Sequence, residues 1–363
     1  MSISTTLTHS LEAWKYLRGL VCLYKPPNYS QKSLIFQLKN KVSQDLNLME
    51  RTVDQSETEL IEANSNNSEE GNLILKTDTM EVMTTGDITD YSTHPLVLGP
   101  GYHPNDIQPS RINNLSDKVS GISLVAINES GRRMASKLRG ANLLKTYHIR
   151  GEFGRATNTG WATGKTVMCQ GFQHVQSRPW LLDQMLVNIS SSHQARAWQV
   201  AEVGLETEDA YQMACQGPVR PKLLSEMIIY NLAMRELKMP HFLLEVQCVD
   251  SGQDDQQSLV TLVQEVAIKC KTVCHVTSIR CAALGPWIPD HALLHKHLSL
   301  QNVLNNISDN RKLYKEYVSK PHTLFSPTIK EKRSREKLQS KKNKENTNSD
   351  DLYTIDTRHL ETF

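Results

Sequence analysis

The chain has 363 residues, of which 39% are hydrophobic and 22% are charged, and its formal net charge is +2 at pH 7. This balance is typical of a soluble protein with room for one large domain or two ordinary ones. No apolar run approaches the roughly 18 residues of a membrane span, so a membrane-spanning helix is excluded, and the near-zero net charge says little about partners.

The N-terminal segment, residues 1–16, is rich in Ser and Thr and contains Glu12 as its one acid. This composition is compatible with a mitochondrial presequence, although the segment is short and only weakly basic. We therefore treat residues 1–16 as a candidate targeting segment. Mitochondrial localisation is the first expectation, and nuclear or cytoplasmic localisation is the alternative.

The ordered sequence is expected to begin near Leu17. Residues 19–24 form an apolar run that ends at Lys25-Pro26, which predicts a strand stopped by proline. Residues 31–42 have helical spacing. From about residue 45 to 90, acidic residues mix with Asn and Ser and the apolar periodicity is lost, which predicts a disordered acidic insertion.

Ordered patterning resumes at His94 and continues as alternating strand and helix patterns. Strands are expected at 122–127, 146–151, 198–203, 243–248 and 275–281, and helices at 131–138, 181–189 and 258–267. This order predicts a mixed α/β (α+β) layout rather than an all-α or sandwich fold. One domain is expected over residues 17–325, interrupted by the acidic insertion.

Residues 326–363 begin with a stretch dominated by Lys and Arg that has no apolar face. We expect a disordered basic tail. Such a tail can contact phosphates, because Lys and Arg displace counterions from nucleic acid, or it can serve as a localisation signal.

The seven cysteines are scattered and odd in number, which favours reduced thiols in an intracellular compartment. Cys270, Cys274, Cys281 and His275 could be interpreted as metal ligands. They lack the paired CxxC units of a zinc site, so small buried residues on a strand are the preferred interpretation. No metal and no cofactor are expected.

Four short motifs occur in a fixed order along the chain. They are GLVCLYKPPNYS at 19–30, NLSDKVSGI at 114–122, KTY at 145–147 followed by FGRATNTG at 153–160, and AYQMACQG at 210–217. Each motif alone is weak. In this order they resemble the motifs of TruB-family pseudouridine synthases, and flanking segments are similar to the divergent animal mitochondrial branch. The resemblance spans residues 19 to about 280.

The resemblance implies the pseudouridine synthase fold, with a mixed, mainly antiparallel sheet flanked by helices. It also implies isomerisation of uridine to pseudouridine in RNA, with mitochondrial mRNA as the substrate of the nearest branch. RNA, single-stranded or in stem-loops, is therefore the expected partner, and mitochondrial RNA-processing proteins are further candidates. Such enzymes flip the target base and hold it against an aromatic or apolar wall.

The reaction needs a carboxylate near the sugar, as a nucleophile or as a base. By resemblance this carboxylate belongs at Ser116, and the neighbouring Asp117 lies one residue late. A one-residue shortening of the loop would let Asp117 substitute, whereas in a fixed register it would point away from the pocket. Asp is also a common turn residue. Both Asp117 and Ser116 are carried as candidate catalytic residues.

Further candidates for binding the substrate follow from the resemblance. Tyr147 matches the tyrosine that stacks on the target base, although a buried aromatic on a strand is the ordinary alternative. Tyr211 matches a second tyrosine near the substrate. It lies in a helical pattern, where an ordinary packing role is an almost equal alternative. Lys25, Lys145 and Arg155 are candidate phosphate contacts, and Arg111, Arg150 and Arg280 are further ones.

One family feature is missing. An arginine that pairs with the catalytic carboxylate should follow Cys248, and the stretch contains Asp250 and Asp254 instead. Added acids would repel a phosphate. Two functions therefore remain open, an active RNA pseudouridine synthase and a catalytically degenerate RNA-binding or assembly factor on the same fold.

Overall fold

The computed structural model describes residues 9–49, 101–177, 179–215, 217–219, 227–249 and 255–319. Its main sheet has seven strands. They are β1 (Gly19–Lys25), β2 (Pro109–Arg111), β3 (Ser120–Ile127), β4 (Lys145–Phe153), β7 (Ile228–Lys238), β8 (His241–Val249) and β9 (Cys274–Leu284). The order is β1-β3-β9-β4-β8-β7, with β2 also paired to β3. The β3–β9 pairing is parallel and the others are antiparallel. This confirms the mixed, mainly antiparallel α/β prediction.

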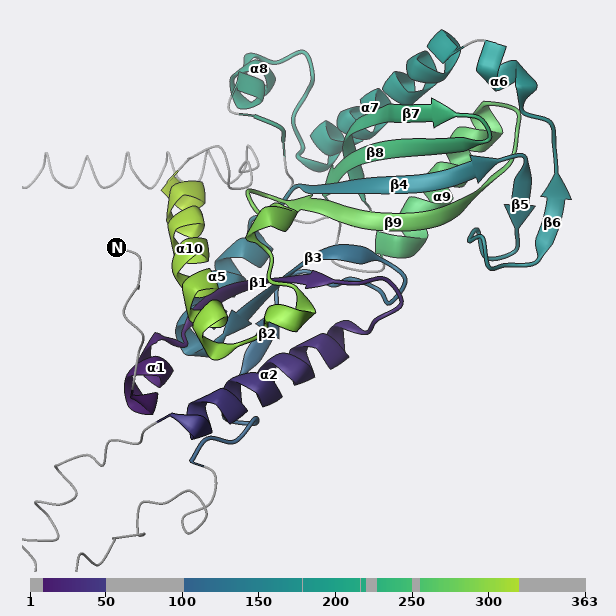
Figure 1. Ribbon diagram of the computed structural model, residues 1–363. Helices are drawn as coiled ribbons and strands as arrows, with labels where there is room; N and C mark the ends of the chain where they lie inside the picture. The colour runs from purple at the N-terminus through teal and green to yellow at the C-terminus, as the bar shows by residue number, and fades with distance from the viewer. Residues whose placement is uncertain are drawn as a thin grey trace, which may run out of the picture.

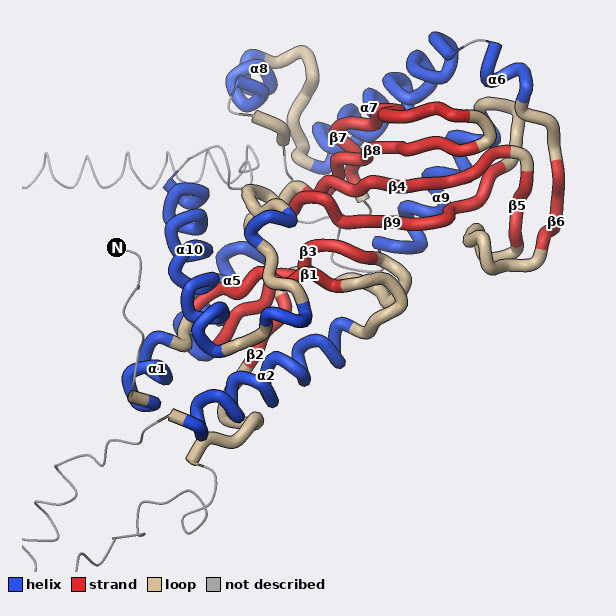
Figure 2. The backbone as a smooth tube through the Cα atoms, in the orientation of Figure 1, coloured by secondary structure: helices blue, strands red, loops and turns tan. Residues whose placement is uncertain are grey.

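Helices flank the sheet on both sides (Figures 1 and 2). The longer ones are α2 (Gln31–Leu48), α5 (Asn128–Gly140), α7 (Pro179–Val200), α9 (Asp255–Lys269) and α10 (Leu300–Ser319). The shorter ones are α1 (Ser10–Tyr16), α6 (Gln173–Ser177), α8 (Glu208–Cys215) and two 3-10 turns at Pro289–His291 and His295–His297. A separate hairpin of β5 (Arg155–Thr157) and β6 (Thr166–Cys169) projects from the end of the molecule. No helix among the described residues is long and apolar enough to cross a membrane.

The N-terminal half of the sheet is buried on both faces. Val21 and Leu23 of β1 join a core with α2 and the start of α10, whereas Leu20 and Cys22 join a second core with α5 and the end of α10. A strand covered on both faces needs an apolar residue at nearly every position, which explains why residues 19–24 form an uninterrupted apolar run.

The C-terminal half is covered mainly on one face. The buried positions of β4 alternate, with Tyr147, Ile149 and Phe153 facing a core that includes α7 and α9. The intervening residues, such as His148, are partly exposed on the other face. This alternation is the pattern of a strand with one face on a core, and it agrees with the alternating strand predicted at 146–151.

One predicted element is wrong. Residues 198–203 were expected to form a strand, but α7 continues to Val200 and the chain then turns. Ala197 and Ala201 are both buried, four residues apart, which is the spacing of one helix face. The turn closes with Glu202 in the left-handed region, at φ 56°. The apolar residues that suggested a strand belong to the end of a helix.

Two predicted boundaries also differ. Order begins before Leu17, because Ser10–Tyr16 form α1 and Ala13 is fully buried. The acidic insertion cannot begin at residue 45, because α2 extends to Leu48. The remainder of that segment, the resumption at His94 and the basic tail from residue 326 lie outside the described residues.

Candidate functional site

The candidate site lies where the two halves of the sheet meet. β3 and β9 pair through only two residue pairs, Ser120 with Arg280 and Gly121 with Cys281. A side chain at Gly121 is impossible in this arrangement, because its Cβ would lie 2.2 Å from the Cys281 carbonyl oxygen. The glycine of the predicted Ser-Gly motif is therefore required by the close approach of two backbones. The loop that carries Ser116 and Asp117 leads directly into this junction.

Lys25 binds the backbone of that loop. Its side chain is fully buried, and its Nζ donates hydrogen bonds to the carbonyl oxygens of Asp117 at 2.9 Å, Val119 at 2.6 Å and Pro26 at 3.3 Å. Burial lowers the pKa of Lys25 to about 8, while the negative charge of Asp117 opposes this shift. Lys25 was predicted to contact phosphate. In the structure its ammonium group is directed at the loop backbone, where it fixes the loop conformation.

Two further side chains, those of Gln31 and Trp161, contact the same loop. The Leu115 N–H donates to Gln31 Oε1 at 3.2 Å, and Gln31 also donates to Ser123 Oγ at 2.7 Å. Lys118 Nζ lies 5.1 Å from the ring centroid of Trp161, a cation–π contact. The loop is thus connected to α2, to β3 and to the turn after β5.

The two candidate catalytic residues have different surroundings. Ser116 is half-buried and its hydroxyl donates to Gln256 Oε1 at the start of α9. Asp117 is exposed, although its charge reaches Lys25. The residue at the family position is thus engaged with a neighbouring helix, and the carboxylate one residue later faces solvent.

Tyr147 and Lys145 lie two residues apart on the buried face of β4. Tyr147 has no exposed surface and belongs to the same core as Leu115 and Val119, the apolar residues on either side of the candidate loop. Lys145 is 6% exposed and lines a cavity beside the loop. The core thus connects Tyr147 to the loop, but its ring is covered in this conformation.

Arg155 lies on β5 and contacts His275 through both its side chain and its backbone. The Arg155 guanidinium lies 3.2 Å from His275 Nε2, and His275 Nδ1 lies 3.1 Å from the Arg155 carbonyl oxygen. His275 is 1% exposed, and burial raises the pKa of the nearby Cys274 thiol to about 12. The Cys274 thiol is buried, and both ring nitrogens of His275 lie within hydrogen-bond distance of Arg155. No group of three metal-binding side chains occurs within the described residues.

Tyr211 stands apart from the junction. It lies on α8 and is 73% exposed, whereas Ala210 and Met213 of the same helix pack in a small separate core. Figure 1 places α8 outside the main sheet. The predicted helix is correct, but the structure does not bring Tyr211 together with the loop.

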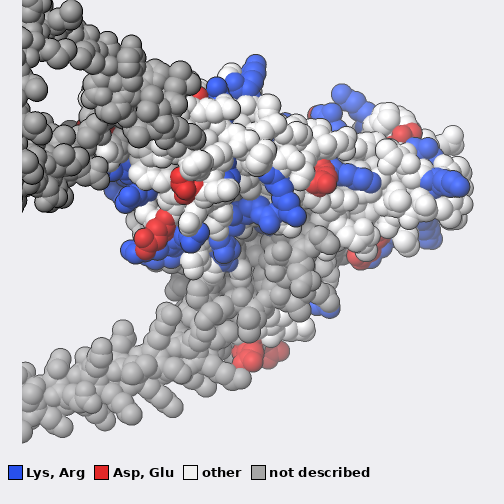
Figure 3. Space-filling view, turned by 90° about the horizontal axis from the view of Figure 1, so that it is seen from below, with Lys and Arg blue, Asp and Glu red and all other residues white. Residues whose placement is uncertain are grey.

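The structure also places residues that the sequence did not single out for a role. Gln31 and Gln256 anchor the loop, and both lie within the first two residues of a helix far away in sequence. Arg280, a candidate phosphate contact, is exposed at the junction with its guanidinium 5.6 Å from the ring centroid of Tyr24. Seen from below, the described surface carries Lys and Arg in its middle as well as towards both sides, with fewer Asp and Glu (Figure 3). Such a surface suits a polyanion.

The chain is similar in sequence to known proteins. Residues 113–252 match the TruB family pseudouridylate synthase N-terminal domain, a range that begins at the candidate loop. The chain is 29% identical to the human protein named Pseudouridylate synthase TRUB2, mitochondrial, over 80% of this chain and 83% of the human one. The Xenopus tropicalis protein of that name is 24% identical over 82% and 87% of the two chains.

Solved structures of lower similarity were also found. One is the archaeal box H/ACA sRNP Nop10-Cbf5 complex, with 11% identity and a TM-score of 0.38, covering 81% of this chain. Another is an H/ACA RNP bound to a substrate RNA containing 2'-deoxyuridine, also with 11% identity and with a TM-score of 0.37. This chain spans about three fifths of the length of either matched chain.

Proposed function

This chain is related to the TruB-family pseudouridine synthases, and we propose that it isomerises uridine to pseudouridine within RNA. The observation that carries the proposal is the loop at the β3–β9 junction. It is held by a buried lysine and by two glutamine side chains, and it presents a carboxylate to solvent. A rigidly anchored loop with one exposed acid is suited to hold a reacting group beside a bound strand.

The reaction needs no electron acceptor and no phosphate donor. The bond between uracil N1 and ribose C1′ breaks, the base turns, and a bond forms between C5 and C1′. The proton lost from C5 is balanced by the one gained at N1, so the product is an isomer of the substrate. A carboxylate can promote the first step by attacking C1′ or by taking a proton from the ribose.

We assign the carboxylate role to Asp117. Ser116 occupies the family position, but a hydroxyl is uncharged at neutral pH, and its hydrogen bond to Gln256 gives it no base that would activate it. In this assignment Ser116 positions the loop against α9. Lys25 binds the carbonyl oxygens of Asp117 and Val119, which fixes the backbone at Asp117 and after it.

The remaining candidates receive roles of different kinds. Tyr147 is proposed as the wall against which the flipped base rests, which requires the side chains packed around its ring to shift when RNA enters. Lys145, Arg155 and Arg280 are proposed to contact phosphates along the strand. Tyr211 is proposed as a more distant contact, since it lies exposed on α8. Lys25 is proposed as a positioning residue.

A second function is favoured by a specific observation. Tyr147 is fully buried and Ser116 is tied to Gln256, so the chain could hold RNA without reacting. In that case it would be a catalytically degenerate RNA-binding or assembly factor. The two functions share the RNA surface and differ in whether Asp117 reaches the ribose.

The relatives bear on location and substrate. The matched vertebrate proteins carry the word mitochondrial in their names, and we propose that this chain also works in mitochondria. Mitochondrial mRNA is then the proposed substrate, and proteins that process such RNA are proposed partners. Nuclear or cytoplasmic localisation is the alternative that fractionation of cells expressing the full chain would test.

Pseudouridine formation on uridine-containing single-stranded and stem-loop RNA tests the proposed reaction. The parent should convert uridine, and Asp117→Asn should lower the rate by about 10²–10⁴-fold, the range expected for loss of an acid–base group. RNA affinity should stay near that of the parent. Ser116→Ala is the matched control in the same loop, and it should retain most of the activity.

Two results would change the assignment. Activity that survives in Asp117→Asn but disappears in Ser116→Ala would place the essential group at Ser116. An inactive parent that still binds RNA would identify the chain as the degenerate factor.

A further inference from the structure

A cavity of about 640 Å³ lies beside the candidate loop. Its walls come from β2, from Asn113 and Asn114 at the start of the loop, from the end of α5, from the start of β4 and from the end of β9. The two asparagines precede Ser116 by only three and two residues. A cavity of this size lies within the range of small-ligand sites and can hold a nucleotide unit.

The lining of this cavity is cationic. Arg111, Arg139 and Lys145 contribute three positive charges from three different elements, and no Asp or Glu is among the twelve lining residues. Asn114 and Asn142 add side-chain amides. Arg111 and Lys145 are separated by 33 residues in the sequence, and Arg139 was not a sequence candidate, so folding alone brings the three cations together.

The two arginines have neutral partners. Arg139 Nη2 donates to Ser110 Oγ at 2.5 Å, and Arg111 Nη1 donates to Asn114 Oδ1 at 3.4 Å. Within the described part of the chain neither guanidinium pairs with a carboxylate. A guanidinium held by a hydroxyl or an amide keeps further N–H donors in a planar fork that suits a phosphate group.

The dipole of α5 does not contribute positive charge to this cavity. Arg139 lies in the last turn of α5, so the cavity faces the carbonyl end of that helix, which carries partial negative charge. Anion sites are commonly built from the backbone N–H groups at a helix N-terminus, and α5 does not present that end to this cavity. Binding of an anion would therefore depend on the three side-chain cations.

We propose that this cavity binds phosphate groups of the RNA strand next to the target nucleotide. The inference rests on the proposed function, since it takes RNA as the substrate and gives it a second point of attachment. The phosphates would be held by Arg111, Arg139 and Lys145 while the loop reaches the neighbouring ribose. Phosphate contacts fix register without reading sequence, so this site sets the position of the strand.

The test is the salt dependence of RNA affinity, measured by fluorescence anisotropy with the full chain and a single-stranded uridine-containing RNA. The slope of log affinity against log salt should become shallower by about 0.7 in Arg139→Gln, because one phosphate contact is lost. Arg139→Lys keeps the charge and should restore most of the slope. Lys137→Gln removes an exposed charge from the same helix outside the cavity, and it should leave the slope unchanged.

The outcomes separate the cavity from other sources of affinity. Equal slopes in the parent, Arg139→Gln and Lys137→Gln would overturn the proposal, as would a parent that binds no RNA. Inorganic phosphate raising the thermal unfolding midpoint of the parent but not of Arg139→Gln, with equal RNA affinity in both, would reassign the cavity to free phosphate. The midpoint of each variant without phosphate shows whether it is folded.

Failure of this inference differs from failure of the proposed function. Pseudouridine formation with an unchanged slope in Arg139→Gln would leave the enzyme standing and remove the phosphate site. A shallower slope in Arg139→Gln with no pseudouridine formed by the parent would support the site on a binding protein.

Discussion

Gly121 is the residue through which the two halves of the sheet come together. Its φ is +123°, and a Cβ there would lie 2.2 Å from the carbonyl oxygen of its β3–β9 partner Cys281. Gly121→Ala should lower the free energy of unfolding by about 1–3 kcal/mol or more, since backbone on both sides would have to move. Denaturant unfolding of the purified variant measures this loss.

Gly140→Ala is the matched control for that experiment. Gly140 ends α5, and a Cβ there meets nothing within 4 Å. This substitution should be neutral or stabilising by up to about 1 kcal/mol, because alanine loses less backbone entropy in a helix. Equal losses in the two variants would show that Gly121 has no special place in the sheet.

The lowered pKa of Lys25 should make the free energy of unfolding depend on pH. Its pKa of about 8 in the folded chain lies below the ordinary lysine value of 10.5. Between these values the unfolded chain binds more protons, so the stability contributed by Lys25 rises with pH through this window and is lost as pH falls through about 8. The free energy of unfolding of the parent should therefore rise relative to Lys25→Met between pH 8 and 10.

The control for this measurement is Lys32→Met, which removes an exposed lysine on α2. The difference in the free energy of unfolding between the parent and Lys32→Met should stay constant between pH 8 and 10. If the free energy of unfolding of the parent relative to Lys25→Met stays flat or falls over this range, Lys25 is not a buried, loop-binding lysine.

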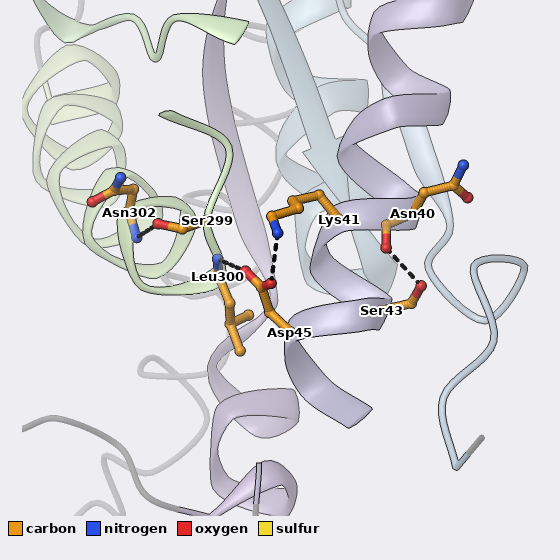
Figure 4. Close-up of polar contacts among 7 residues, drawn as sticks. All are labelled: Asn40, Lys41, Ser43, Asp45, Ser299, Leu300 and Asn302. Carbon is orange, nitrogen blue, oxygen red and sulfur yellow. Dashed lines mark hydrogen bonds and ion pairs between the residues drawn. The ribbon is translucent and has the colours of Figure 1, made fainter. Parts of the chain in front are cut away.

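At the scale of elements, α2 and α10 are joined by a side-chain cap. Asp45 of α2 accepts a hydrogen bond from the Leu300 N–H at 2.8 Å and lies 3.3 Å from Lys41 Nζ (Figure 4). Ser299 Oγ also accepts a hydrogen bond from the Asn302 N–H at 3.4 Å. A negative charge at the start of α10 also suits the positive end of that helix. Asp45 thus connects helices that are 251 residues apart in sequence.

Asp45→Ala should destabilise the chain by about 1 kcal/mol, within the range for loss of a helix cap. Lys41→Ala breaks only the exposed (i, i+4) ion pair and should cost about 0.5 kcal/mol or less. Thermal or denaturant unfolding compares the two variants. A loss in Lys41→Ala as large as in Asp45→Ala would show that the ion pair, and not the cap, is what matters.

At the scale of the molecule, α10 closes the N-terminal half. Asn310 is fully buried, receives a hydrogen bond from Trp287 Nε1 at 3.0 Å and donates to the Leu20 carbonyl oxygen at 3.2 Å. Asn306 accepts from the Cys22 N–H at 2.9 Å. The backbone groups at the outer edge of β1 therefore find their hydrogen-bond partners in residues almost 300 positions away, so α10 is part of the same packed unit as β1.

The basic segment beyond α10 is predicted to act through charge alone. Under the proposed function, a chain that ends at residue 325 should bind RNA more weakly at low salt, with a shallower salt slope, because lysines and arginines that can contact phosphate are removed. The free energy of unfolding should change little. RNA titrations at two or more salt concentrations, paired with denaturant unfolding, check both statements. Unchanged affinity at low salt would assign the tail a different role, such as localisation.

The sequence by itself determined the class of fold and the position of the candidate loop. Residues 19–24 are apolar throughout and residues 122–127 are apolar except for Ser123, because both faces of these strands are buried, and this pattern is visible without coordinates. The alternation in β4 was equally visible. The strand predicted at residues 198–203 was wrong because a short segment with four apolar residues among six fits a strand and the end of a buried helix equally well.

The tertiary structure alone decided what surrounds the candidate residues. Lys25 matches a motif, but the target of its ammonium group depends on where residues 117–119 cross it. Gln256 and Arg139 have no local signal, since their partners are Ser116 and a cavity built from several elements. Local patterns report burial and periodicity within a segment. Contacts between distant side chains depend on how the strands and helices are arranged, which no single segment encodes.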